Sequence, residues 1–214
     1  MMKKLLTTVP MIIGMILIFQ GGYMDVKAKV SQILISTSWA NRIAGERPIK
    51  PWWWADTRAI AKMEVPRLQQ TLYIMQDDSG ESLAFGPGHM PASAKPSANG
   101  HVIIAGHRDS HFEFLKDIQI GDVVSTENSQ SIKKEYRVKQ IEIIDTRDQQ
   151  INVHEFDYLT LITCYPFEDF IPSGPLRLIV HAEPIEKKHS ELFCLLYTSP
   201  SPRDLSTSRM PSSA

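Results

Sequence analysis

The sequence predicts an all-β domain, a barrel or a sandwich, that follows an N-terminal helical region. From Pro66 onward, short apolar stretches alternate with turn residues, a spacing typical of small β domains. The stretch Glu135–Ile143 alternates charged and apolar residues, as expected of a strand with one solvated face. A chain of 214 residues is long enough for one such domain and an appendage.

The first residues are typical of an export signal. Lys3 and Lys4 precede the largely apolar stretch Leu5–Phe19. No small-residue cleavage site follows closely, which favours an uncleaved signal anchor over residues 1–23 rather than a removed signal peptide. Because the two lysines would remain cytoplasmic, we expect a single-pass protein of the inner membrane with its domain on the periplasmic, extracytoplasmic side.

Residues 24–63 are expected to form a helical linker before a domain at 64–188. Val26–Ile43 has apolar residues at a mostly helical spacing, and Ala55–Met63 could add another amphipathic turn. The run Trp52–Trp54 between them has two interpretations. The tryptophans either pack the linker onto the core or form an interfacial belt against lipid headgroups.

The expected strands are separated by segments rich in turn residues. Gly86–Gly100 reads as a loop or short helix, and Asn128–Ser131 as a hairpin turn. The strands are expected at Leu68–Met75, Ser82–Phe85, His101–Ala105, Asp122–Thr126, Lys134–Asp145, Tyr158–Thr163 and Leu176–His181.

Composition limits the partners and the structure of the C-terminus. With 23 Lys and Arg against 24 Asp and Glu, the chain lacks the basic excess typical of nucleic-acid binding, so that class is excluded. Residues 189–214 are expected to be disordered or not native to the protein, because Ser, Thr and Pro dominate there without apolar periodicity. The chain has only two cysteines, Cys164 and Cys194, and a disulfide between them is the alternative to a reactive thiol.

Three strand-like runs each present one side chain suited to acyl transfer. Cys164 ends an apolar run, and a cysteine acts as a nucleophile only as thiolate, which calls for a nearby base. His107 ends another run, after a glycine that would let the backbone turn tightly. Arg177 lies in a third run and could stabilise the oxyanion of the transition state. If the strands of Cys164 and Arg177 pair, both side chains share one edge of the sheet.

These residues lie in motifs that resemble those of the sortases, the cysteine transpeptidases of bacterial surfaces. Thr160–Cys164 matches a TLxTC motif, Ala105–Asp109 resembles the histidine segment, and Leu176–Arg177 resembles the arginine strand. The resemblance implies a closed eight-stranded β-barrel with short helices. It also implies roles: Cys164 as nucleophile, His107 as general acid and base, and Arg177 as the oxyanion-stabilising or substrate-orienting group.

The resemblance further implies a substrate and a reaction. A protein with a C-terminal LPxTG-like sorting signal would be cleaved through a thioacyl enzyme and passed to an amine acceptor of unknown identity, with no cofactor. The phrases Thr163–Phe167 and Ser173–Arg177 look most like the Gram-negative sortases related to class D. In the loop Tyr165–Leu176, we expect apolar residues to form the wall that binds the signal: Phe167, Phe170, Ile171 and Pro172.

Other functions remain open at this point. One is an envelope enzyme of another kind, either a membrane-anchored cysteine peptidase or an L,D-transpeptidase-like enzyme, and another is a non-catalytic β-domain that binds an envelope partner. No metal site is expected, because the remaining histidines lack ligand spacing. The carboxylates Asp77, Asp78 and Glu81 fit a solvated turn better than a calcium site.

Overall fold

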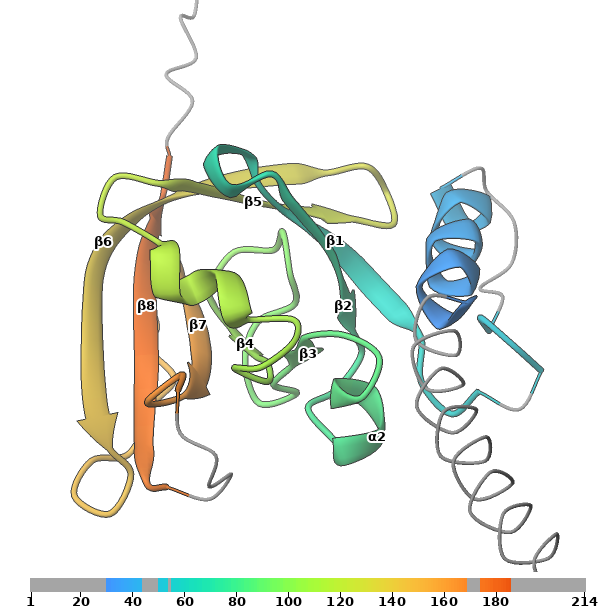
Figure 1. Ribbon diagram of the computed structural model, residues 1–214. Coiled ribbons are helices and arrows are strands. Elements are labelled where there is room, and N and C mark those ends of the chain that lie inside the picture. Colours follow the sequence, from blue (N-terminus) through green and yellow to red (C-terminus); the bar gives the residue numbers. More distant parts are fainter. Residues whose placement is uncertain (1–29, 44–49, 54, 169–173, 186–214) are drawn as a thin grey trace, which may run out of the picture.

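Eight strands close into a barrel in the computed structural model, which describes residues 30–43, 50–53, 55–168 and 174–185 (Figure 1). Around the barrel the order is β1-β2-β3-β4-β7-β8-β6-β5, so the predicted closed eight-stranded barrel is confirmed. The strands are β1 Ala59–Val65, β2 Gln70–Met75, β3 Gly88–His89, β4 His101–Ala105, β5 Val123–Asn128, β6 Lys133–Asp145, β7 Tyr158–Cys164 and β8 Leu176–Pro184.

Short helical segments complete the barrel. They are the 3₁₀ turns η1 Pro66–Leu68 and η2 Glu113–Asp117 and the helix α2 Gly80–Leu83, together with a helix described over residues 30–43. The barrel interior is filled by apolar side chains from the strands and from the segment that contains η2. Among them, Phe112 and Leu161 are at most 1% exposed, and Tyr136 is fully buried. This closed core fixes which face of each strand remains on the outside.

Strand β1 corrects the prediction of a further helical turn over residues 55–63. Its buried positions alternate strictly, at Ala59, Ala61, Met63 and Val65. Each edge of β1 pairs with a neighbour, β2 on one side and β5 on the other. Alanine, lysine, methionine and glutamate favour helices, but pairing on both edges overrides this weak local preference.

Between β2 and β4, one more prediction was wrong and another was incomplete. The expected strand at Ser82–Phe85 is instead the end of the helix α2 and the turn that follows it. The N-cap residue of α2, Ser79, accepts a hydrogen bond from the Ser82 amide at 3.3 Å. The expected loop or short helix at Gly86–Gly100 contains β3, which pairs parallel with β2 and antiparallel with β4. Only two residues, Gly88 and His89, define β3, and so short a strand has no recognisable alternation in the sequence.

The other strands and one turn agree with prediction to within three residues at each end. At the predicted hairpin turn, the Asn128 side chain accepts hydrogen bonds from the amides of Gln130 and Ile132. Ser131 adopts a positive φ of 58° there. The sequence therefore predicted the strands that carry the three candidate reactive residues.

The helix at residues 30–43 lies against the barrel beside β1 and β2 (Figure 1). Ile35 and Trp39 are buried in a second apolar cluster with Met75. The Arg42 guanidinium donates a hydrogen bond to the Ala59 carbonyl at 2.7 Å. The helix is thus held to the barrel by packing and by a hydrogen bond. The sequence predicted a helical linker here, but not these contacts with the barrel.

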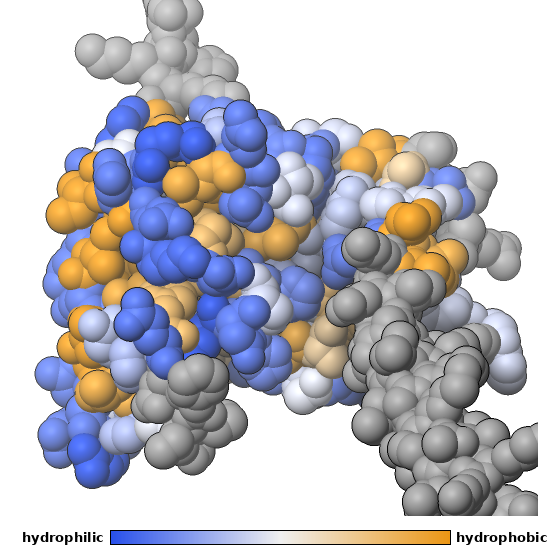
Figure 2. Space-filling view, in the orientation of Figure 1, coloured by the Kyte–Doolittle hydropathy of each residue, from blue (hydrophilic) through white to orange (hydrophobic). Residues whose placement is uncertain are grey.

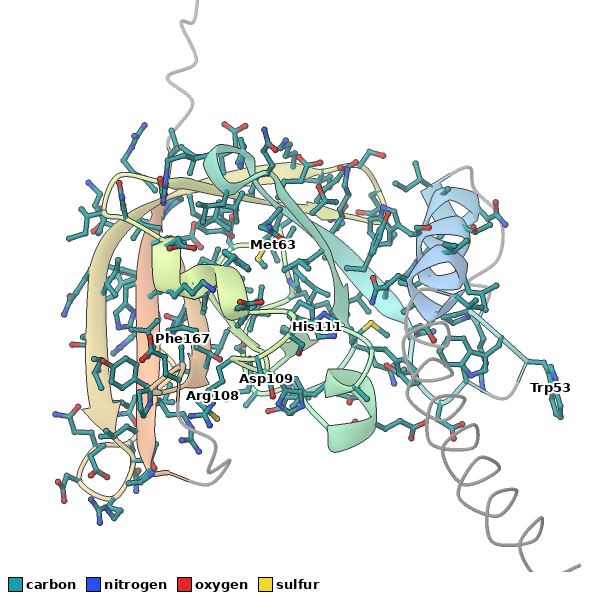
Figure 3. The ribbon with its side chains drawn as sticks, in the orientation of Figure 1. Trp53, Met63, Arg108, Asp109, His111 and Phe167 are labelled. Carbon is teal, nitrogen blue, oxygen red and sulfur yellow. The ribbon has the colours of Figure 1, made fainter. Side chains whose placement is uncertain are left out.

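The neighbouring tryptophans differ from one another. Trp52 packs edge-on against Phe85 with ring centroids 4.9 Å apart, as the core-packing interpretation expects. Trp53 points away from the barrel and is 85% exposed (Figure 3). The predicted anchor at residues 1–23 and the predicted tail at 189–214 lie outside the described residues. Within the described part of the chain, no helix is long and apolar enough to cross a membrane.

The face of the molecule seen in Figure 2 is mostly hydrophilic, with separate hydrophobic areas between the polar ones. One hydrophobic area lies over the helix at residues 30–43. Exposed apolar side chains of that helix include Val30, Ile33 and Leu34. The helix therefore presents apolar side chains both to the barrel and to its outside.

Candidate active site

Cys164 and Arg177 are direct partners on paired strands. Strands β7 and β8 are antiparallel, and their register places Cys164 opposite Arg177. Directly opposite residues of an antiparallel pair project to the same face of the sheet. The predicted pairing of these two strands is confirmed, and it places thiol and guanidinium at one end of the pair.

His107 is brought to the same level from β4. This strand runs parallel to β7, with Ala105 in register with Ile162. Beyond β4, the Gly106 amide donates to the Ile162 carbonyl at 3.0 Å, and the Thr163 hydroxyl donates to the Gly106 carbonyl at 2.8 Å. These bonds continue the parallel register by one residue, and a further residue brings His107 level with Cys164. His107 is exposed and Cys164 half-buried, so both face solvent.

Gly106 is required for space and not for a turn. Its φ lies outside the left-handed region, so the tight turn expected from the sequence is not the reason for a glycine here. A Cβ at this position would lie 2.7 Å from the ring of Phe112, which is fully buried. The Phe112 amide also donates to the His107 carbonyl at 2.9 Å. The core residue Phe112 therefore holds the segment that presents His107.

The outer face of three strands, β7, β8 and β6, carries side chains in three rows. Odd positions of β7 from Leu159 to Leu161 belong to the core, and the alternate positions face outward. Register partners across β7, β8 and β6 then define the rows. We call them the reactive row, Cys164, Arg177 and Ile144; the middle row, Ile162, Ile179 and Glu142; and the polar row, Thr160, His181 and Gln140.

Arg177 is held at the start of β8 by carbonyl groups of its own segment. Nη1 donates to the Gly174 carbonyl at 2.6 Å and to the Leu176 carbonyl at 2.9 Å. Within the described residues, Nε and Nη2 make no hydrogen bond. The guanidinium is thus fixed by one nitrogen, with two others left to bind an anionic oxygen.

Arg108, the residue after His107, ties two segments of the site together. It is only 8% exposed, and its Nη1 donates to the Pro166 carbonyl at 2.5 Å. This bond joins the segment that follows β4 to the segment that follows Cys164. The sequence motifs assigned Arg108 no reactive role. Its burial depends on the fold of the loop at 165–168, which no local pattern reveals.

An open hollow of about 590 Å³ lies beside Arg108. Figure 3 shows Arg108, Asp109 and Phe167 on the same side of the barrel. The predicted binding-wall residue Phe167 lines this hollow, and its ring lies edge-on to Tyr165. The other predicted wall residues, Phe170, Ile171 and Pro172, lie outside the described residues. The hollow is lined by Arg108, Asp109, Glu113, Lys116, Tyr165, Pro166, Phe167 and Glu168.

A second histidine, His111, lies near His107. Burial, and next the positive charge that His107 can carry, lower the pKa of His111, while a hydrogen bond to the main chain of Ala84 and the carboxylate of Asp109 oppose this shift. The lowered pKa favours a neutral His111 ring. His107 and His111 are only four residues apart in the chain, but no sequence pattern singled out His111.

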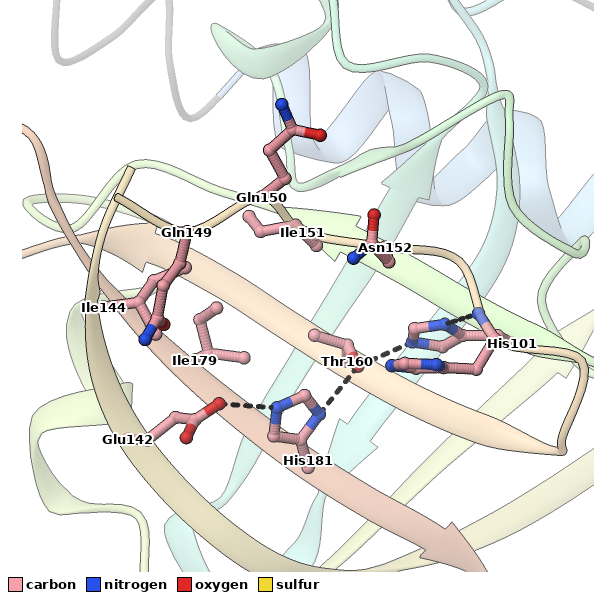
Figure 4. A pocket seen from close by; sticks show the side chains of 11 residues that line it. His101, Glu142, Ile144, Gln149, Gln150, Ile151, Asn152, Thr160, Ile179 and His181 are labelled. Carbon is pink, nitrogen blue, oxygen red and sulfur yellow. Dashed lines mark hydrogen bonds and ion pairs between the residues drawn. The ribbon is translucent and has the colours of Figure 1, made fainter. Parts of the chain in front are cut away.

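Four side chains of β4, β7, β8 and β6 form a hydrogen-bonded series that we call the relay: His101, Thr160, His181 and Glu142 (Figure 4). Thr160 Oγ1 lies 2.7 Å from His101 Nε2 and 3.1 Å from His181 Nδ1. His181 Nε2 lies 3.2 Å from Glu142 Oε1. Burial of His101, aided by His154 and His181, lowers its pKa to about 4. From the sequence, these histidines were considered only as metal ligands, and their spacing did not fit a metal site.

No metal site emerges from the described part of the chain. It holds no group of three or more His, Cys, Asp or Glu side chains placed to bind an ion. Asp77, weighed as a calcium ligand, instead accepts hydrogen bonds from the amide and hydroxyl of Ser79. Cys164 is a free thiol in the described residues, and Cys194 lies outside them.

The closed barrel brings a cysteine, a histidine and an arginine together at one end of three adjacent strands, β4, β7 and β8. This arrangement is that of an enzyme with a cysteine nucleophile. Residues 63–185 match the family model of the sortase domain, more than half of the chain, and the chain therefore belongs to the sortase family. The resemblance noted from the sequence motifs is confirmed, and it replaces the L,D-transpeptidase-like alternative.

Named relatives agree with this family. Sortase D of Bacillus subtilis (strain 168) is 30% identical over 123 residues, which cover 56% of this chain and 61% of that protein. This match is consistent with the class D resemblance. Among solved structures, sortase C1 from Streptococcus suis is 26% identical with a TM-score of 0.52, and covers 59% of this chain and 73% of that one. The pilus-related Sortase C of Group B Streptococcus is 30% identical with a TM-score of 0.51, and covers 59% and 67%.

Proposed function

We propose that this protein is a cysteine transpeptidase that cleaves a sorting signal through a thioacyl enzyme and transfers the cleaved protein to an amine. One observation carries the proposal: Cys164 and Arg177 are direct partners on β7 and β8, and the hydrogen bonds of Gly106 bring His107 level with them. Family membership and the likeness to a Sortase D support the same activity.

Acylation needs a nucleophile, an oxyanion binder and an acid. The Cys164 thiolate attacks the carbonyl carbon of the scissile peptide bond, and a C–S bond forms while the carbonyl oxygen becomes an oxyanion. Nε and Nη2 of Arg177 are free within the described residues to donate to that oxygen. The C–N bond then breaks, and His107 gives a proton to the leaving amine.

Deacylation reverses these roles with a new amine. The acceptor amine attacks the thioester carbonyl while His107 takes its proton, and the C–S bond breaks to return the Cys164 thiolate. Water in place of the amine would give hydrolysis. Both His107 and Cys164 face solvent, so an acceptor can approach the reacting carbon.

The finer assignments rest on the sequence motifs. We propose an LPxTG-like signal cut between Thr and Gly, and a protein of the Gram-negative subgroup. We also propose that residues 1–23 anchor the chain in the inner membrane with the barrel on the periplasmic side. The charged start and apolar stretch that follows it support this placement.

Phe167, Phe170, Ile171 and Pro172 remain our proposal for the wall that binds the signal. The position of Phe167 in the hollow beside Arg108 supports it. Replacing Phe170 by serine should raise the KM for a signal peptide at least about threefold, because an apolar contact is lost. An unchanged KM would show that the signal binds elsewhere.

Intact-mass spectrometry of the full chain tests the reaction. The protein, in detergent, is incubated with a Leu-Pro-Ala-Thr-Gly peptide, with and without triglycine as amine acceptor. We expect an acyl adduct on Cys164 that the amine removes, no adduct for Cys164→Ala, and slow adduct formation for Arg177→Ala. A hydrolysed peptide without transfer would indicate a peptidase. No adduct with any sorting-signal peptide, despite a folded protein and a thiol that iodoacetamide alkylates, would favour a non-catalytic binding domain.

A further inference from the structure

The helix at residues 30–43 has an outward face that carries no charge. Its exposed side chains lie on the side of the helix opposite the buried Ile35 and Trp39, and we call them the outer stripe: Val30, Ile33, Leu34, Thr37, Ala40 and Ile43. The only charged residue of the helix, Arg42, is bound to the barrel through the Ala59 carbonyl. A surface helix normally turns charged and polar residues to the solvent, so the outer stripe indicates a partner.

The hydroxyl groups beside the outer stripe are hydrogen-bonded within the helix. The Thr37 hydroxyl and the Ser36 hydroxyl both donate to the Ile33 carbonyl at 2.8 Å. Each hydroxyl hydrogen is thereby used inside the helix and needs no water as acceptor. Ile33 itself is 64% exposed. This face of the helix is therefore able to enter apolar surroundings without leaving those donors unpaired.

Trp53 adds a large aromatic side chain on the same side of the barrel as the helix (Figures 1 and 3). It is 85% exposed and points away from the barrel. The preceding residue, Trp52, packs against the cluster that contains Ile35 and Trp39, so this segment lies against the helix. Tryptophan is enriched where a membrane meets water, because its ring is apolar and its N–H is polar.

The rest of the chain indicates what covers the outer stripe. The apolar stretch of the proposed membrane anchor ends at Phe19, eleven residues before Val30. An extended chain spans at most about 3.6 Å per residue, so the helix begins within about 40 Å of the end of that stretch. Residues 24–58 carry six Lys and Arg against three Asp and Glu. This basic excess attracts anionic lipid headgroups and repels a second copy of the same surface.

We infer that the outer stripe and Trp53 form a docking surface for the headgroup region of an anionic membrane. This inference rests on the proposed anchor at residues 1–23, which brings the membrane within reach. The helix lies in the plane of the interface with the barrel on its other side, because Ile35 and Trp39 are already packed against the barrel. Docking fixes the orientation of the barrel on the membrane and takes no part in the reaction at Cys164.

The test places a fluorescent label at two positions of matched exposure. Ile33 is 64% exposed on the helix, and Ile120 is 68% exposed in the turn between η2 and β5. Ile33→Cys or Ile120→Cys is introduced into the full chain together with Cys164→Ala and Cys194→Ala, so that one thiol remains. A nitrobenzoxadiazole maleimide then labels that thiol.

The first measurement uses vesicles of phosphatidylethanolamine and phosphatidylglycerol, with and without a lipid that carries a nitroxide at its headgroup. The nitroxide should quench the label of Ile33→Cys by at least about half and that of Ile120→Cys by less than about a tenth, because only the first lies at the interface. Equal quenching of the two labels would overturn the docking surface. A label of Ile33→Cys that is shielded from iodide in the water but not quenched by the lipid would show that a second copy covers the helix, and it would also overturn the inference.

The second measurement alters one end of the surface and reads the other. The label is placed at Trp53→Cys, and Ile33→Glu is compared with the control Ile120→Glu. A carboxylate in the outer stripe must be desolvated on docking and is repelled by anionic lipid, so Ile33→Glu should lower the quenching at least about threefold. Ile120→Glu should leave it unchanged. Unchanged quenching in Ile33→Glu would show that the outer stripe is not the surface that docks.

Flotation of the vesicles separates docking from anchoring. Protein that floats without a difference between Ile33→Cys and Ile120→Cys would retain the proposed anchor and lose the docking surface, whereas protein that does not float would lose both. Neither measurement uses a substrate or the Cys164 thiol. A failure of the proposed transpeptidation would therefore leave these results as they stand.

Discussion

The two ends of one barrel face are built differently. At the reactive end, His107 is exposed, Cys164 is half-buried, and Arg177 is held through a single nitrogen. At the other end, His101 and Thr160 are buried, and each has partners at its polar atoms. Groups that exchange partners during a reaction must stay accessible, whereas groups that support the fold gain from fixed bonds.

Because the reactive end is accessible, substitution of Cys164 should abolish the reaction but hardly change the stability of the fold. Replacing Cys164 by alanine should lower transpeptidation about 10⁴-fold or more, because no other group can form the acyl enzyme. The free energy of unfolding should change by less than about 1 kcal/mol, since a half-buried side chain at a strand end is removed. Product formation and urea denaturation of the same samples measure both quantities. A residual activity near wild type would remove Cys164 from the mechanism.

Gly106 connects the reactive end to the core, so altering it should affect both activity and stability. In Gly106→Ala the new Cβ would lie 2.7 Å from the Phe112 ring, and the ring or the His107 segment must move. We expect a loss of about 2 kcal/mol in unfolding free energy and a fall in activity of about tenfold. Gly80→Ala is the matched control, because nothing lies within 4 Å of a Cβ there. Equal stability of the two variants would contradict the close contact.

The relay end should respond to pH. The pKa of His101 is about 4 in the fold, below about 6.5 for a free histidine, because of burial and then of His154 and His181. Between these values the unfolded chain binds a proton that the folded chain does not. The stabilisation is therefore complete above about pH 6.5 and is lost as the pH falls toward 4. Tyr158 and, through His181, Glu142 also face this group.

Urea denaturation at pH 7, 5.5 and 4 measures the effect. Wild type should lose about 2 kcal/mol more than His101→Gln over this range, because glutamine does not titrate. The difference between the two proteins removes the contribution of carboxylates, which both share. Parallel curves for the two proteins would mean that His101 titrates alike in the folded and unfolded chains.

The sequence was a good guide to strands whose pattern is local. The apolar run that ends at Cys164 and the run around Arg177 could be placed, and their pairing followed from their closeness in the chain. Strand β1 was missed because helix-favouring residues such as Ala61 obscured its alternation. Helix α2 was missed because Ser79 acts as an N-cap in a segment too short for a helical period.

The sequence predicted that Cys164 and Arg177 lie together at one edge of the sheet, but it did not predict the side chains that support the candidate site. The relay joins His101 to Thr160, 59 residues away, and Thr160 to His181, 21 residues away, and these residues meet only because β4, β7 and β8 are neighbours. A weak signal was present: Thr160 is four residues before Cys164, and His181 is four after Arg177, so each pair shares a face. Arg108 gave no such signal, because its partner is a loop carbonyl.

Arg108 gives the smallest expected effect and the sharpest test of the difference between the two ends, because it is a buried, fixed group at the reactive end. In Arg108→Lys the charge remains, but the planar fork that reaches the Pro166 carbonyl is lost. We expect a loss of about 1 kcal/mol in unfolding free energy and a fall in kcat of about fivefold, since the segments after His107 and Cys164 are no longer joined. Arg147→Lys is the control, since its side chain is 74% exposed and pairs with Asp145. Urea denaturation and single-turnover acylation measure the two effects. If Arg108→Lys changed kcat no more than Arg147→Lys, accessible residues alone would determine the reaction, and fixed supports would matter only at the relay end.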